Sequence, residues 1–161
     1  MSQLIEPLNG RFFRIVFAQY EAEVLNGVRS PEGRFHHAGQ RAFYASPRAD
    51  WAGIAVDGFR KPDDAPRITI ALDIRDARVI DFRKRQSCTS LGLPFECSRI
   101  PWQPQRALGQ RATSWIASDA SRESGADGMI YPARSDTERW HLLLFRWNEL
   151  GGPQVRVEGQ N

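Results

Sequence analysis

At 161 residues, the chain has the length of one domain with a single hydrophobic core. Its hydrophobic content of 41% is ordinary for a globular protein, and it contains no apolar run long enough for a transmembrane helix, so we expect no membrane association. The net charge of +3 is carried almost entirely by scattered arginines, which argues against a nucleic-acid-binding surface.

The first half of the chain predicts two strands and a helix. Its apolar spacing predicts a buried strand over residues 12–18, a second strand over residues 41–45 and a helix over residues 47–59. Its glycines predict a loop over residues 21–39, between the two strands. Ser46 is the expected N-cap of that helix, with Pro47 in its first turn. The helix should bury an apolar face made of Trp51, Ile54, Ala55 and Phe59.

The second half predicts strands around one further helix. Ile68, Ile70, Leu72 and Ile74 alternate with polar residues, which is typical of a half-buried strand over residues 67–74. Further strands are expected at residues 78–82, 129–131, 141–147 and around 155–157, and a helix at residues 113–124 that ends before Gly125. Residues 83–110 show no clear pattern and are expected to wrap the surface. The prediction is an α+β domain with a mixed or antiparallel sheet and two to three helices.

Three segments stand in the order that is typical of a known family. The first is FFRIVF, followed by a loop and then GRFHHAGQRAFYAS, in which Gly33, Arg34 and an aromatic residue precede Tyr44 at a strand end. The second is PRITIALDIRDARVIDF, and the third is SGADGMIYPARSDTERWHLLLF. Together they extend from Phe12 to Trp147, and through them the chain resembles the RES domain family.

The resemblance implies a fold similar to that of ADP-ribosyltransferases over the whole chain, residues 1–161, with a core at about residues 12–147. It also implies a bacterial toxin that consumes NAD as its substrate by breaking the nicotinamide–ribose bond. The expected protein partner is an Xre-type antitoxin, and homo-oligomerisation stays open. The start of the chain lacks a basic segment followed by an apolar block, so the cytoplasm is the expected location.

Two of the three residues that give the family its name are absent from the expected positions. The arginine corresponds to Arg34, but the glutamate position reads Ala55 and the serine position reads Ala133, with Ser135 as the nearest hydroxyl. Cleavage of an N-glycosidic bond passes through a cation that a carboxylate stabilises. An alternative function is therefore a RES-fold module that binds NAD, another nucleotide or a protein and has weak or no catalysis.

The candidate site residues follow from this chemistry. Arg34 would hold the pyrophosphate as a bidentate donor, and Tyr44 would stack on nicotinamide; these two are the catalytic candidates. Each has an alternative role, Arg34 as a solvated loop residue and Tyr44 as a core residue. The expected NAD-binding set is Arg14, Arg34, Phe35, His36, Tyr44, Arg134 and Ser135.

Metal binding is not expected. Cys88 and Cys97 have no metal-site spacing, and free thiols are favoured over a small disulfide loop because the cytoplasm is reducing. Besides the cysteines, only His36, His37 and His141 could supply zinc ligands of the usual type. The first two lie in the loop that carries Arg34.

Overall fold

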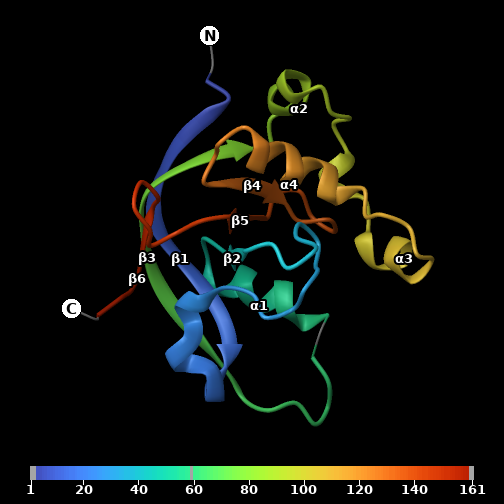
Figure 1. Ribbon diagram of the computed structural model, residues 1–161. Helices are drawn as coiled ribbons and strands as arrows, with labels where there is room; N and C mark the ends of the chain where they lie inside the picture. The colour runs from blue at the N-terminus through green and yellow to red at the C-terminus, as the bar shows by residue number, and fades with distance from the viewer. Residues whose placement is uncertain (1–2, 59, 160–161) are drawn as a thin grey trace.

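The computed structural model describes residues 3–58 and 60–159, and its elements follow one another in a single α+β domain (Figure 1). The elements are β1 (Ile5–Phe17), the 3-10 helix η1 (Ala18–Asn26), β2 (Phe43–Ala45), α1 (Ala49–Asp57), β3 (Arg67–Asp81), α2 (Arg85–Leu91), the 3-10 helix η2 (Cys97–Arg99), α3 (Trp102–Ala107), α4 (Ser114–Glu123), β4 (Gly128–Pro132), β5 (Trp140–Leu144) and β6 (Gln154–Val157). The predicted fold class is confirmed. In the described part of the chain, no helix is long and apolar enough to cross a membrane.

All six strands belong to one mixed sheet. Its order is β1-β3-β4-β5-β2, and β6 pairs with β3. β3 and β4 are parallel, and the other pairs are antiparallel. The sheet curls until the end of β2 meets β1, where Phe13 and Ser46 exchange two backbone hydrogen bonds of 2.7 and 2.9 Å.

The prediction of two strands at residues 67–74 and 78–82 is wrong, because β3 is continuous. A bulge at Asp76, which has a φ of 61°, shifts the register against β1 between Leu8 and Gly10. The Asp76 N–H donates to Asn9 Oδ1 at 2.8 Å, so the bulge is satisfied from the neighbouring strand. The extra residue interrupts the alternation that began at Ile68, and the sequence pattern therefore looks like two strands.

The predicted N-cap at Ser46 is also wrong. Arg48 holds the cap position of α1, and its side chain makes no capping hydrogen bond. The Ser46 hydroxyl instead pairs with His141 Nδ1 at 2.8 Å. The backbone of Ser46 is still extended there, because it bridges to β1.

α1 does not bury the predicted apolar face. Ala52 is buried, whereas Ile54 is 44% exposed and Ala55 is exposed. The helix has only nine residues and packs mainly against β1, so a single position enters the core. Phe59 lies outside the described residues.

The two faces of the sheet bury two hydrophobic clusters. Side chains alternate along each strand, so Ile130 joins one cluster while Met129 and Tyr131 join the other. α2, η2 and α4 cover the face that carries Tyr131, and Figure 1 shows α4 lying beside β4. We call this side the helix-covered face.

Short helices occupy segments that the sequence predicts to be irregular. η1 begins at Ala18, the predicted end of the first strand, and extends into the predicted loop 21–39. α2, η2 and α3 fall within residues 83–110. With three to nine residues each, these helices are too short to display a clear apolar period.

Candidate functional site

The loop that carries Arg34 is held by side chains of α4. Trp115 Nε1 donates to the Gly33 carbonyl at 2.8 Å, the Ser114 hydroxyl donates to the Arg34 carbonyl, and Arg122 Nη1 donates to the Phe35 carbonyl at 2.9 Å. Helix α4 therefore fixes three successive carbonyl groups of this loop. A Cβ atom at position 33 would collide with the ring of a neighbouring histidine, so glycine is required there.

Arg34 is partly buried and has no carboxylate partner in the described part of the chain. Its Nη2 donates to the Ser98 carbonyl at 2.8 Å and to the Pro132 carbonyl at 3.3 Å, while its Nε is buried without a hydrogen bond. The guanidinium carbon lies 4.8 Å from the ring centre of Phe35 and 4.9 Å from that of Tyr131. Burial lowers the pKa of Arg34 to about 10, so the group remains a cation at neutral pH.

Tyr44 and His36 lock the same loop. The Tyr44 hydroxyl accepts a hydrogen bond from the Phe35 N–H at 3.1 Å and lies 2.8 Å from His36 Nδ1, and His36 Nε2 lies 3.1 Å from the Ser30 carbonyl. A neutral histidine that donates from Nε2 and accepts at Nδ1 satisfies every one of these contacts. Burial lowers the pKa of His36 and raises the pKa of Tyr44, which favours this neutral arrangement.

Three more arginines lie near Arg34 at the end of β4, and we call Arg34, Arg99, Arg134 and Arg139 the arginine cluster. Arg99 Nη2 donates to the Arg134 carbonyl at 3.5 Å, and Arg139 Nη2 donates to the Ser135 hydroxyl at 2.8 Å. The Nε atoms of Arg99 and Arg139 are buried without partners, like that of Arg34. Repulsion from Arg134 and Arg99 adds, after burial, to the lowering of the pKa of Arg34.

Carboxylates reach this cluster only at its edge. Arg99 pairs with Glu96 at 2.8 Å and Arg139 pairs with Asp136 at 3.3 Å, and both carboxylates are about half exposed. The positive charge of the cluster is therefore only partly neutralised within the described residues. Arg34, Arg134 and Ser135 were expected from the sequence, whereas Arg99, the last residue of η2, and Arg139, directly before β5, were not.

The positions that correspond to the family glutamate and serine lack both groups. Ala133 is buried and directly follows β4, the strand that carries Tyr131. Ala55 is exposed on α1. The two carboxylates nearest to it in sequence pair with exposed arginines, Asp50 with Arg48 at 2.9 Å and Asp57 with Arg60 at 3.0 Å.

Arg14 lies apart from the arginine cluster, on the other face of the sheet. Its guanidinium contacts the Phe43 ring at 4.4 Å, and Phe43 and Tyr44 point to opposite faces of β2. Its Nη1 donates to the Val24 carbonyl at 2.7 Å, and burial lowers its pKa to about 10. It lines a hollow of about 260 Å³ that neither Arg34 nor Tyr44 lines.

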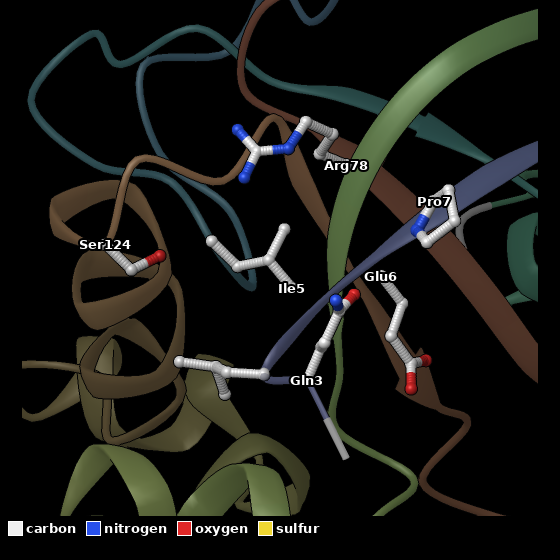
Figure 2. A pocket seen from close by; sticks show the side chains of 7 residues that line it. Gln3, Ile5, Glu6, Pro7, Arg78 and Ser124 are labelled. Atoms are coloured by element: carbon white, nitrogen blue, oxygen red, sulfur yellow. The ribbon is translucent and has the colours of Figure 1, made fainter. Parts of the chain in front are cut away.

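A wider hollow of about 590 Å³ lies beside the N-terminal end of β1 (Figure 2). Figure 2 shows Arg78 and Ser124 pointing toward Ile5, while Glu6 points away from them. Glu6 pairs with Lys84 at 2.6 Å. This hollow has an aliphatic and polar lining without an aromatic ring among the described residues, so it offers no stacking surface for a nucleotide.

Metal and disulfide chemistry find no support in the described residues. No group of three or more histidine, cysteine, aspartate or glutamate side chains in residues 3–58 and 60–159 could hold a metal ion. Cys88 and Cys97 are free and buried.

The chain is similar to known proteins both in sequence and in fold. The family model of the RES domain matches residues 11–161. Among solved structures, the fold is similar to that of a chain in the crystal structure of the M. tuberculosis MbcT–MbcA toxin–antitoxin complex. The TM-score is 0.59 and the sequence identity is 16%, over 94% of this chain and 84% of that chain. A search of curated proteins finds no match.

Proposed function

Because the chain belongs to the RES domain family, we propose that it is a RES-type toxin or effector that binds NAD and breaks the bond between nicotinamide and ribose. The observation that carries this proposal is the arginine cluster, in which the partly buried Arg34 has no carboxylate partner among the described residues and its Nε is buried without a hydrogen bond. A buried cation that lacks a counter-charge is costly unless a ligand supplies one. The pyrophosphate of a dinucleotide is such a ligand.

In this proposal the residues of the loop that carries Arg34, and those at the end of β4, have distinct roles. Arg34 and Arg134 bind phosphate oxygens, and Ser135 lies next to them as a further donor. Phe35 and Tyr131 supply the aromatic faces against which the Arg34 guanidinium is held. Tyr44 and His36 position the loop through the hydrogen bonds described above. The rings of Tyr44 and Tyr131 form a T-shaped pair with their centres 6.5 Å apart.

We infer that the protein partner is an antitoxin, of the Xre type that the family resemblance implies. The support is the similar fold in the MbcT–MbcA complex, whose title names a toxin and an antitoxin. A toxin that depletes NAD must be held inactive inside its own host, which gives such a partner its role.

The second candidate function is an NAD-binding or nucleotide-binding module without catalysis. The observation that favours it is the pair of alanines at positions 55 and 133, one exposed on α1 and the other buried at the end of β4. Neither alanine can stabilise a developing cation or activate water. The two functions share the arginine cluster and differ only in turnover.

Calorimetric titration with ADP-ribose tests the site that both functions share. Arg34→Ala should weaken the affinity about tenfold or more, because it removes charge-assisted hydrogen bonds to phosphate. Arg34→Lys should weaken it as well, since lysine retains the charge but not the planar fork. Arg60→Ala is the matched control, because Arg60 is half exposed and pairs with Asp57 on the surface. Wild-type affinity in both Arg34 variants would exclude the arginine cluster as the phosphate site.

A further inference from the structure

Three polar side chains form a row across the sheet beside the arginine cluster, and we call Ser46, Tyr131 and His141 the polar row. Tyr131 of β4 and His141 of β5 are direct partners in the register, and the hydroxyl of Ser46, directly after β2, lies 2.8 Å from His141 Nδ1. Side chains alternate along β5, and Leu142 belongs to the cluster on the other face. His141 therefore projects to the helix-covered face, together with Tyr131.

The Tyr131 ring connects the polar row to the arginine cluster. The Arg34 guanidinium carbon lies 4.9 Å from the centre of this ring, and the centre of the His141 ring lies 5.6 Å from it. Arg139, another member of the cluster, directly precedes β5, the strand that carries His141. Because Arg34 and His141 lie against one ring on one face, a single diphosphate–ribose unit can contact both.

His141 is a neutral ring with a defined tautomer. Burial and then the charges of Arg34 and Arg139 lower its pKa, so the imidazole is uncharged at pH 7. Among the described residues the Ser46 hydroxyl has His141 as its only hydrogen-bond partner, and it is satisfied as a donor when it donates to Nδ1. A neutral imidazole that accepts at Nδ1 carries its proton on Nε2.

Two polar atoms of this row, His141 Nε2 and the Tyr131 hydroxyl, form no hydrogen bond with the described residues. The completely buried side-chain atoms that lack a partner in this part of the chain are the Nε atoms of Arg34, Arg99 and Arg139. Solvent therefore reaches His141 Nε2 and the Tyr131 hydroxyl, although each residue is only 6% exposed. An oxygen of a bound ligand can take the place of that solvent.

We propose that His141 is a ligand-binding residue of the NAD site and that its Nε2–H donates to an oxygen of the dinucleotide next to those that Arg34 binds. This inference rests on the proposed function. Phosphate oxygens and ribose hydroxyls both accept such a hydrogen bond. An uncharged donor suits this position, because a further cation beside Arg34 and Arg139 would add repulsion before the ligand arrives.

Calorimetric titration of two His141 variants with ADP-ribose tests this assignment. Asparagine reaches Ser46 but is too short to place an N–H near the position of Nε2, so His141→Asn should weaken the affinity about tenfold or more. Glutamine keeps a polar atom near Ser46 and also reaches the position of Nε2, so His141→Gln should retain most of the affinity. The two variants are matched controls, because both remove the titrating ring and differ in the donor.

Inorganic pyrophosphate distinguishes the two kinds of oxygen. If His141→Asn weakens the binding of pyrophosphate as well as that of ADP-ribose, Nε2–H donates to a phosphate oxygen. If it weakens only the binding of ADP-ribose, Nε2–H donates to a ribose hydroxyl. Either result supports His141 as a ligand-binding residue.

Nitrogen NMR of the wild-type histidines tests the assignment without a variant, and it decides the question if His141→Asn does not fold. At pH 7 His141 should carry its proton on Nε2, and ADP-ribose should shift that signal. An unshifted signal, wild-type affinity in His141→Asn, or an equal loss in both variants would overturn the assignment. The proposed function would stand in each case if Arg34→Ala still weakens binding. A wild-type protein that does not bind ADP-ribose would overturn both proposals.

Discussion

Two partly buried arginines, one on each face of the sheet, are held by carbonyl groups and aromatic rings. Arg14 bonds to the Val24 carbonyl and lies on Phe43, and Arg34 bonds to two carbonyls and lies between Phe35 and Tyr131. Neutral partners of this kind fix the side chain but leave the positive charge in place. Both guanidinium groups thus keep a positive charge and N–H donors with which an anionic or oxygen-rich ligand could interact.

At the scale of single residues, the sequence shows that Arg14 and Arg34 have unusual neighbours, but not where the two side chains lie. Gly33 and Phe35 beside Arg34, and the apolar neighbours of Arg14, mark both as unusual. The sequence does not show that the two occupy opposite faces of the sheet, because this depends on the register between β1 and β2.

His141 makes stability depend on pH. Burial, and then the charges of Arg34 and Arg139, lower its pKa to about 4 from an ordinary value of about 6.5. Because the folded state keeps this histidine neutral, its contribution is complete above about pH 6.5 and is lost as pH falls toward 4. Between pH 7 and pH 5 this should cost about 2 kcal/mol of unfolding free energy.

Urea unfolding at pH 7 and pH 5 checks this prediction. His141→Gln should lose that part of the pH dependence, because glutamine keeps a polar group opposite the Ser46 hydroxyl but does not titrate. An equal loss of stability in wild type and variant between the two pH values would show that His141 is not the titrating group.

At the scale of elements, α4 connects the loop that carries Arg34 to the core. Besides its bonds to residues 33–35, it contributes Asp119, which bonds to His37 Nε2 at 3.0 Å, and Trp115, whose ring stacks on His37 at 4.4 Å. Arg122 also reaches the Arg41 carbonyl at 3.0 Å. A loop held at both ends by one helix keeps Arg34 in position before a ligand arrives.

Trp115→Phe should loosen this loop. The change leaves the Gly33 carbonyl without its donor and should lower the unfolding free energy by about 1–3 kcal/mol. Hydrogen exchange should rise in residues 33–41 more than elsewhere. Ile116→Ala is the control on the same helix, because Ile116 is 42% exposed and should change stability by no more than about 0.5 kcal/mol. Unchanged exchange in residues 33–41 would show that the loop does not depend on α4.

Strands with a strong pattern are predicted well, and elements set by tertiary contacts are not. β4 and β5 each begin one residue before the predicted starts at Met129 and His141, because a buried apolar run is visible in the sequence. β5 ends at Leu144, three residues before the predicted end at Trp147. The break in β3 is misplaced because the Asp76 bulge is stabilised by Asn9, which is distant in the chain. The start of α1 is misplaced because Ser46 is used by β1 and His141.

At the scale of the whole molecule, the curled sheet creates two chemically different surfaces. The helix-covered face presents the arginine cluster at the end of β4, and the other face carries the hollow that Arg14 lines. The family match over residues 11–161 includes both surfaces. The α+β class follows from the sequence alone. The curl of the sheet involves a bridge between Phe13 and Ser46, which no local sequence pattern predicts.

The measurement that tests the central claim most directly is the release of nicotinamide from NAD by the purified chain, followed together with the appearance of ADP-ribose or its adduct. The account predicts nicotinamide release by the wild type, with one ADP-ribose product formed for each nicotinamide, and a loss of at least about tenfold in kcat/KM for Arg34→Ala. Intact NAD after prolonged incubation with folded wild-type protein would contradict the claim that this chain consumes NAD.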